Sequence, residues 1–474
     1  MNAEPTEALG GFPFDPTPRD MRAMADVVVE ALIAWIGGLE EAPADATEGA
    51  LAVARRLAVA PPEVGTRDFE RLLDDALDAA RHTFEYSGPG YLAYIPGGGL
   101  YSAALAEFLA QGLNRYVGLW QPSPAIVQLE ENVTRWLCGL FDFPTATSQG
   151  VLTTGGSLAN LSAVVTARHS RLGADFLDGT YYVTDQAHGS NTKAAMIAGF
   201  GARNVRLVPT DADLRMDPGA LSSMVATDRA AGLRPFLVIG AAGTTNTGAI
   251  DPLEAIAEIA ERETMWFHID AAYGGFFQLT ERGRGAFRGS ERADSITLDP
   301  HKGLFLPYGT GGLIVRDRDA MRDAHFEGAA YLQDLPPGGE LPNYNELTPE
   351  LSRDVRGLRV WFPLVLHGVA AFRDALDEKL DLTRRITDAL RADPNLEVGW
   401  DPQLSVVAFR MLGGDEDRSR QLLERINATK RVFLSSTLIR GAYWLRVCIV
   451  SHRTHADRID ECAAIIREAA AALV

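Results

Sequence analysis

The sequence has few cysteines, no long apolar run and a deficit of positive charge. Its three cysteines, Cys138, Cys448 and Cys462, are too few and too scattered for a disulfide framework or a paired-cysteine metal site, and no metal is expected. No run of about eighteen apolar residues is present, so a simple membrane helix is not expected. The first residues lack a basic stretch followed by an apolar one, so no signal peptide is expected. These absences favour a reducing cytoplasm.

The charge balance limits the partners of the protein. The 45 basic and 63 acidic residues give a net charge of -18. Nucleic acids and anionic membrane surfaces attract basic patches, so neither is expected as a partner. The 474 residues exceed one ordinary domain, and the 46% hydrophobic content is typical of a globular protein.

Residue patterns divide the chain into three parts. Residues 1–86 read as a helical amino-terminal arm, with apolar positions at helical spacing. In residues 87–366, short apolar runs alternate with helical patterns, which predicts an α/β domain whose mainly parallel central sheet is covered by helices. Residues 324–345 contain Pro-Pro-Gly-Gly and no period, which predicts a mobile loop. Residues 367–474 mix helices and strands and predict a small α+β domain.

The expected elements of the second and third parts follow from these patterns. The strands expected in the central sheet are Gly150–Thr154, Thr180–Thr184, Asn204–Val208, Pro235–Gly240, Met265–Ile269 and Ser295–Leu298. A long helix is expected over Leu364–Arg391, followed by strands over Leu404–Arg410 and Tyr443–Val450.

A glycine-rich turn follows the first of these strands. The run TTGGSLAN, residues 153–160, joins a predicted strand to a predicted helix. Backbone amides at such a turn bind anions with help from the helix dipole; Gly156 allows a close approach and Ser157 adds a hydroxyl. An ordinary turn with a serine cap fits the run equally well. The run matches neither GxGxxG nor GxxxxGK[ST], which disfavours a dinucleotide or a nucleoside triphosphate.

Two charged residues follow other predicted strands. Asp270, in WFHIDAAYGG, falls at the edge where open α/β sheets bind ligands, and it could keep a pyridine nitrogen protonated or simply cap a turn. Lys302, in DPHKGLFL, stands in an unusually apolar place for a lysine, although its stem could pack while its amine reaches water. A covalent bond to a cofactor explains this lysine without a buried free ammonium.

His188, in DQAHGS, is a candidate for the face of a cofactor ring. It follows a predicted strand, and it could stack on a ring, transfer protons or be structural. Ala272 could rest against a ring, and His301 could reach a phosphate or pack. A phosphate cradle, a carboxylate, an amine and a ring-face residue are what pyridoxal phosphate needs from a protein, so one cofactor accounts for all of them.

These motifs resemble those of a known family. Gly-Gly-Ser, Asp-Gln-Ala-His, His-Ile-Asp-Ala-Ala and Asp-Pro-His-Lys, in this order and spacing, resemble the group II pyridoxal-phosphate decarboxylases, which include aromatic L-amino-acid, histidine and glutamate decarboxylases. The resemblance runs from about Tyr91 to the carboxyl end. It implies the type I aminotransferase fold, a homodimer with active sites at the subunit interface, and decarboxylation of an L-amino acid to an amine and carbon dioxide.

The resemblance also implies individual roles. Lys302 would hold the cofactor as a Schiff base, Asp270 would pair with the pyridine nitrogen, and His188 would stack on the ring. The opposite ring face, the ring hydroxyl and the phosphate would be contacted by Ala272, by Thr245, and by Gly156, Ser157 and His301.

Tyr331 resembles the tyrosine of the family's mobile loop, which reaches the partner subunit's site and protonates the carbon that loses carbon dioxide. Members with Phe there tend to give aldehydes, so Tyr331 favours plain decarboxylation; a hydrophobic anchor in a loop is an equal interpretation. An aldehyde synthase or another lyase with this cofactor is the alternative function. A non-catalytic nucleotide-binding α/β protein is a more distant one.

Three positions depart from the family pattern. Gly303 stands where Trp is frequent, Asp299 where Asn is common, and Gly97 where some relatives place a hydroxyl near the substrate carboxylate. The candidates for the substrate pocket are Tyr94, Pro96, Tyr116 and Trp120. The aromatic residues among them slightly favour an aromatic substrate, although they fit a hydrophobic core equally well.

Overall fold

The computed structural model describes residues 14–66, 68–328 and 339–474, and within these ranges it contains a seven-stranded and a four-stranded sheet. The strands are β1 (Gln149–Thr153), β2 (Gly179–Thr184), β3 (Val205–Val208), β4 (Arg234–Ala241), β5 (Trp266–Asp270), β6 (Ser295–Leu298), β7 (Gly311–Val315), β8 (Leu396–Val398), β9 (Val406–Met411), β10 (Ser435–Ile439) and β11 (Ala442–Cys448). The helices are α1 (Pro18–Gly38), α2 (Ala50–Leu57), α3 (Phe69–Arg81), α4 (Tyr101–Leu113), α5 (Pro124–Leu140), α6 (Gly156–Leu172), α7 (Gly189–Ile197), α8 (Pro218–Ala230), α9 (Leu253–Arg262), α10 (Glu281–Arg284), α11 (Pro300–Gly303), α12 (Arg318–His325), α13 (Arg356–Arg391), α14 (Glu416–Ala428) and α15 (Ala456–Ala471).

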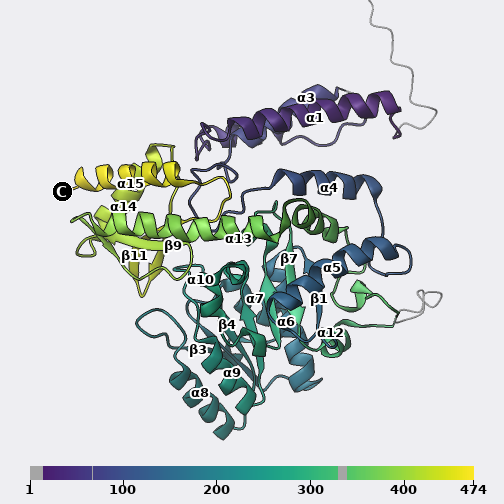
Figure 1. Cartoon of the computed structure of the whole chain (residues 1–474), viewed down its shortest axis with the longest axis vertical. Helices are drawn as coiled ribbons and strands as arrows, with labels where there is room; N and C mark the ends of the chain where they lie inside the picture. Colours follow the sequence, from purple (N-terminus) through teal and green to yellow (C-terminus); the bar gives the residue numbers. More distant parts are fainter. Residues whose placement is uncertain (1–13, 67, 329–338) are drawn as a thin grey trace, which may run out of the picture.

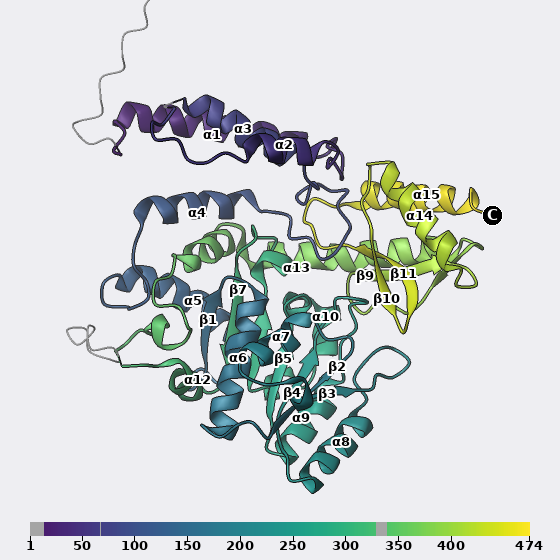
Figure 2. The ribbon, with the colours of Figure 1, turned by 180° about the vertical axis from the view of Figure 1, so that it is seen from behind.

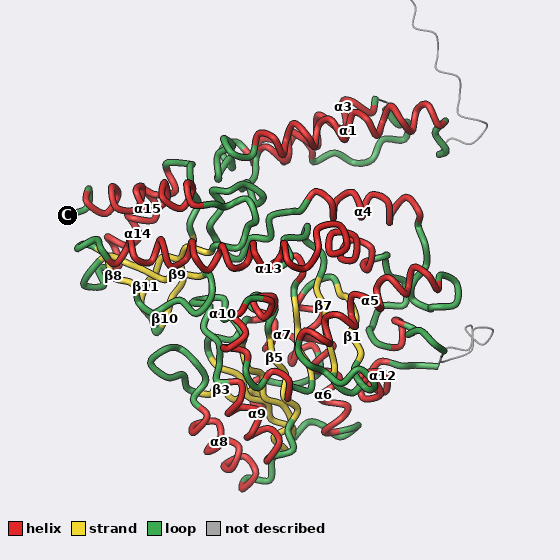
Figure 3. The backbone as a smooth tube through the Cα atoms, in the orientation of Figure 1, coloured by secondary structure: helices red, strands yellow, loops and turns green. Residues whose placement is uncertain are grey.

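The large sheet has the order β1-β7-β6-β5-β4-β2-β3 and is parallel except at β7. Its strands are apolar on both faces: Val238 lies in one buried cluster with α8 and α9, whereas Leu237 and Ile239 lie in another with α6 and α7. Helices therefore cover both faces, as the tube of Figure 3 shows. The α/β fold predicted from the sequence is confirmed.

Strand β7 is the element of this sheet that the sequence analysis missed. It lies antiparallel between β1 and β6. It begins with Gly311 and Gly312, and glycines weaken the pattern by which strands are recognised. Its first glycine is required by packing, because a Cβ on Gly311 would lie 2.4 Å from the carbonyl carbon of Gly155.

Helix α13 connects the large sheet to the small one, as Figure 1 shows. It begins at Arg356, eight residues before the predicted start at Leu364. Pro363 lies inside the helix, and because proline ordinarily interrupts helices, the first turns were not predicted. The helix bends at Gly368, whose φ is 76°. Beyond it, the antiparallel sheet of order β10-β11-β9-β8 shares one apolar cluster with α14 and α15.

The amino-terminal helices α1 and α3 lie side by side in both views of the ribbon (Figures 1 and 2), and Figure 2 shows α2 at one end of the pair. None of the described residues of α1, α2 or α3 is buried. The segment after α1 is joined to α15 and to the turn after α14: Arg458 donates to the carboxylate of Glu40 at 2.8 Å, and Ala44 N donates to Lys430 O at 2.7 Å. No helix in the described ranges is long and apolar enough to cross a membrane.

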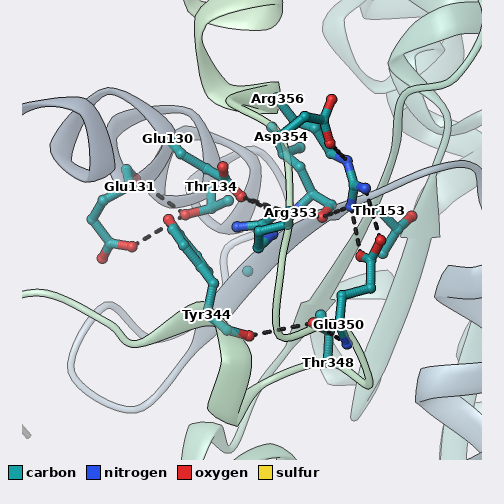
Figure 4. A network of polar contacts seen from close by, with 12 residues as sticks. Glu130, Glu131, Thr134, Thr153, Tyr344, Thr348, Glu350, Arg353, Asp354 and Arg356 are labelled. Atoms are coloured by element: carbon teal, nitrogen blue, oxygen red, sulfur yellow. Dashed lines mark hydrogen bonds and ion pairs between the residues drawn. The ribbon is translucent and has the colours of Figure 1, made fainter. Parts of the chain in front are cut away.

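A buried ionic network ties the chain after residue 338 to the end of β1 (Figure 4). The side chain of Arg353 is fully buried; its guanidinium donates to Glu130 at 2.8 Å and to the carbonyl of Leu152 at 2.7 Å. The same guanidinium lies 4.5 Å from the ring centre of Tyr344. Leu152 directly precedes the glycine-rich turn of residues 153–160. The network therefore supports the strand end from which that turn begins.

Candidate active site

A cavity of about 470 Å³ opens at the carboxyl edge of the parallel strands. It brings together most of the site residues predicted from the sequence: Tyr94, Gly156, Ser157, His188, Thr245, Asp270, Ala272, His301 and Lys302. The predicted pocket residues Pro96, Tyr116 and Trp120 do not line the described part of this cavity. Tyr331 falls outside the described residues.

The glycine-rich turn forms the amino terminus of α6 at this cavity. Gly155 is the N-cap residue, and within the described chain no side chain caps the first amides of the helix. Gly155 also packs directly on Gly311, which brings the backbone of the turn against β7. Uncapped amides and a helix of seventeen residues make this end a suitable place for a phosphate group.

Asp270 lies at the end of β5 and is buried. Its Oδ2 accepts hydrogen bonds from Asn160 at 3.0 Å and from Asn191 at 2.8 Å, and its Oδ1 accepts from the backbone N–H of Ala272 at 3.2 Å. Burial alone would raise the pKa of Asp270, but the hydrogen bond from Asn191 and the neighbouring basic side chains together outweigh burial and lower that pKa. The carboxylate is therefore ionised, as a partner for a protonated pyridine nitrogen must be.

Lys302 lies in the short helix α11, and its amine reaches the cavity. Its Nζ is 2.9 Å from Oδ2 of Asp299, whose Oδ1 is buried and has no hydrogen-bond partner among the described residues. The neighbouring His301 donates from Nδ1 to the carbonyl of Thr310 at 2.6 Å, which leaves Nε2 toward Asp299 at 3.7 Å. Burial lowers the pKa of His301, so its imidazole is neutral near pH 7.

His188 is the N-cap residue of α7. Its Nδ1 accepts from the backbone N–H of Ser190 at 3.2 Å and lies 2.7 Å from the Ser190 hydroxyl. The other edge of the imidazole is free to meet the cavity that His188 lines.

The predicted substrate residues occupy different surroundings. Tyr94 lines the cavity, is 56% exposed and has a φ of 55°, a strained value for a residue with a side chain. Pro96 is buried one residue beyond the lining residue Ile95. Tyr116 donates to the carbonyl of Leu351 at 3.2 Å, and the backbone N–H of Trp120 donates to Asn343 at 3.2 Å. The last two therefore lie beside the chain that follows residue 338.

Packing explains two of the departures from the family pattern. A Cβ on Gly303 would lie 2.7 Å from Cβ of Phe276, so a tryptophan cannot occupy this position without displacing that ring. A Cβ on Gly97 would lie 2.1 Å from the backbone oxygen of His301. The chain passes too close to the lysine segment at this point to carry a hydroxyl side chain.

Three polar residues at the site, Asn160, Ser190 and His268, have no role predicted from the sequence. All three are buried: Asn160 is hydrogen-bonded to Asp270, Ser190 to His188, and His268 to Asn160. A periodicity argument could have found two of them. His268 precedes Asp270 by two positions and shares its face of β5, and Asn160 follows Ser157 by three positions on α6.

The residues of the cavity fit pyridoxal phosphate. The uncapped amino terminus of α6 suits the phosphate, the ionised Asp270 suits the pyridinium, and the amine of Lys302 suits the aldehyde.

Comparison with known proteins gives a consistent picture. Residues 66–412 match the family described as "Pyridoxal-dependent decarboxylase conserved domain". The chain is 31% identical to an aromatic-L-amino-acid decarboxylase of Bacillus atrophaeus over 93% of both chains, and 30% identical to a phenylacetaldehyde synthase of Arabidopsis thaliana over 86% of this chain and 88% of that protein. A solved structure of Oryza sativa TDC with PLP and tryptamine superposes with a TM-score of 0.92 at 26% identity, covering 97% of this chain and 99% of that one.

Proposed function

Since the chain belongs to the pyridoxal-dependent decarboxylase family, we propose that it converts an aromatic L-amino acid to the corresponding amine and carbon dioxide. Family membership confirms four expectations from the sequence: a group II decarboxylase, the type I fold, pyridoxal phosphate as cofactor, and an amino-acid carboxy-lyase reaction. The observation that supports this proposal is that Lys302, Asp270 and the amino terminus of α6 line one cavity.

Each residue at the cavity has a proposed task. When bound, pyridoxal phosphate supplies an electron sink for the electron pair left behind as carbon dioxide departs. Lys302 provides the amine that anchors the cofactor and later releases the product. The carboxylate of Asp270 stabilises the protonated pyridine nitrogen, because the lowered pKa of Asp270 keeps that carboxylate ionised. Gly156, Ser157 and His301 hold the phosphate.

The remaining roles concern the ring and the proton. We assign His188 and Ala272 to opposite faces of the ring and Thr245 to the ring hydroxyl; all three line the cavity. Tyr331 or His188 returns a proton to the α-carbon.

The aromatic substrate is supported by the relatives and by the lining. Proteins named for aromatic substrates are similar to the chain over most of its length. Tyr94 offers an exposed ring at the cavity. Purified enzyme incubated with aromatic, acidic and aliphatic L-amino acids and scored for carbon dioxide and amine tests the proposal. Release from aromatic substrates alone supports it, and preferential release from glutamate contradicts it.

An aldehyde synthase is the second candidate, because a phenylacetaldehyde synthase is 30% identical to this chain. Tyr331 favours the amine. Measuring amine, aldehyde and hydrogen peroxide in the same reaction separates the two functions, since aldehyde formation by oxidation consumes oxygen and releases peroxide.

We also propose that the protein is a cytoplasmic homodimer. Apolar side chains are exposed on α4 and on neighbouring α13, at Leu105, Phe108, Leu109, Val365 and Leu366. Such a group of exposed apolar side chains is typical of a subunit interface. The three cysteines are free and buried, which suits a reducing compartment. Light scattering tests the dimer, and cell fractionation tests the location.

A further inference from the structure

A chain of buried hydrogen bonds behind the cavity has a defined direction. It starts from Asp270, whose ionised Oδ2 can only accept. The Asn160 atom 3.0 Å from that oxygen must therefore be the amide nitrogen, Nδ2. This places Oδ1 of Asn160 against Nε2 of His268 at 3.1 Å. Because Oδ1 can only accept, Nε2 of His268 carries a hydrogen.

The far side of His268 agrees with this assignment. The indole N–H of Trp266 donates to Oγ of Ser295 at 2.8 Å, so the hydroxyl of Ser295 directs its own hydrogen to Nδ1 of His268 at 2.8 Å. Burial lowers the pKa of His268 to about 4, so the ring is neutral near pH 7. Both nitrogens of this histidine are thus fixed, one as acceptor and one as donor.

The directions of the hydrogen bonds also determine which nitrogen of His188 carries hydrogen. The second hydrogen of the Asn160 amide goes to Oγ of Ser190 at 2.9 Å. Ser190 therefore turns its hydroxyl hydrogen to Nδ1 of His188, 2.7 Å away, and its backbone N–H also donates to that nitrogen. An Nδ1 that accepts two hydrogen bonds carries no hydrogen, which places the hydrogen of His188 on Nε2.

We propose that Asn160 and Ser190 are positioning residues that orient Asp270 and hold His188 as the neutral imidazole with its hydrogen on Nε2. In this form His188 is a hydrogen-bond donor toward the cavity and has no spare lone pair with which to act as a base. A neutral imidazole also gives up its hydrogen far less readily than an imidazolium. His188 therefore contributes stacking and a hydrogen bond and does not supply the proton for the α-carbon. Only this last step rests on the proposed function, because the tautomer belongs to the cofactor-free chain.

The tautomer is tested on cofactor-free protein with diethyl pyrocarbonate, which reacts with an unprotonated imidazole nitrogen. The modified His188 peptide is followed by mass spectrometry near pH 7. Wild-type His188 should react slowly, because Nε2 carries hydrogen and the lone pair of Nδ1 is held by Ser190. Ser190→Ala and Asn160→Ala should each accelerate the reaction about fivefold, as expected for the loss of one neutral hydrogen bond. Ser190→Thr, which keeps a hydroxyl, should stay close to wild type.

Asn204→Ala is the matched control, because Asn204 is also a buried, hydrogen-bonded asparagine but lies near Leu177 and Gly179. It should leave the His188 rate unchanged, while circular dichroism checks that every variant is folded. Equal rates in wild type, Ser190→Ala and Asn160→Ala would overturn the inference.

A second measurement addresses the orientation of Asp270. Asn160→Asp is isosteric but replaces the donor facing Asp270 with an acceptor, so the dissociation constant for pyridoxal phosphate should rise at least tenfold over wild type, with Asn204→Ala unchanged. An unchanged constant would contradict the positioning role. If instead the amine-forming activity were absent from wild type while the tautomer result held, the proposed function would fail and this inference would stand.

Discussion

At the scale of single residues, the phosphate cradle depends on the missing side chain of Gly311. The Gly311→Ala substitution should push the Gly155 backbone away, since the added Cβ would lie 2.4 Å from it. Overpacking of this kind costs about 1–3 kcal/mol, so the dissociation constant for pyridoxal phosphate should rise about tenfold or more. Gly312→Ala is the control, because its added Cβ would find its nearest neighbour at an ordinary 3.6 Å. Equal affinities in the two variants would show that the contact does not shape the cradle.

The fate of the substrate carbon should depend on Tyr331. Tyr331→Phe should lower amine formation about a hundredfold, the usual contribution of a general acid, and raise aldehyde or transamination products. Product chromatography with an oxygen electrode measures both. The control Tyr443→Phe alters an aromatic residue of the small domain that packs on Arg420. A Tyr331→Phe enzyme with the wild-type product profile would remove the proton-donor role.

Site residues could be predicted from the sequence where their role depends on a local motif, and not where it depends on contacts between distant segments. Lys302, Asp270 and His188 could be proposed from sequence because each follows a predicted strand within a short motif. The role of Asn160 could not, because it depends on the direction of hydrogen bonds among α6, α7 and β5. Such a direction is visible only once these elements are placed together.

At the scale of elements, the network around Arg353 should hold the end of β1 in place (Figure 4). Arg353→Met would leave Glu130 buried without its cation, which costs about 3–5 kcal/mol in the free energy of unfolding. Chemical denaturation followed by circular dichroism measures this loss. The double variant Glu130→Leu with Arg353→Met should recover part of it, because both charges are then absent. Equal losses in the single and double variants would argue against the ion pair as the cause.

The elements themselves were predictable where their pattern was unbroken. The other strands of the large sheet are short apolar runs between polar turns, and each was placed within about two residues. Strand β7 and the first turns of α13 were not predicted, because Gly311, Gly312 and Pro363 are residues that ordinarily weaken strands or end helices. Packing against Gly155 and β1 outweighs that local preference.

At the scale of the whole molecule, we propose domains over residues 1–86, 87–366 and 367–474. The second boundary falls beside Gly368, where α13 bends. The periodicity of residues 1–86 predicted the helices of the amino-terminal arm. It could not predict which surface covers their unburied apolar side chains, because the pattern of one chain does not show a contact with another.

The proposed homodimer gives a prediction at this scale. Light scattering should find twice the chain mass of 51.3 kDa. Phe108→Glu together with Leu366→Glu should yield monomers, because two charges would have to be buried in the interface. Leu177→Glu, at a similarly exposed leucine outside α4 and α13, should leave the dimer intact. A wild-type monomer, or dimers that resist the double substitution, would contradict the interface.

The central claim is that Lys302 carries the cofactor, and borohydride reduction of the loaded enzyme tests it most directly. Reduction followed by proteolysis and mass spectrometry should place the pyridoxyl group on the peptide containing Lys302. Lys302→Ala should abolish labelling, whereas Lys379→Met, which replaces a fully buried lysine of α13, should retain it in folded protein. A pyridoxyl group on a different lysine, or labelling that persists in Lys302→Ala, would contradict the account.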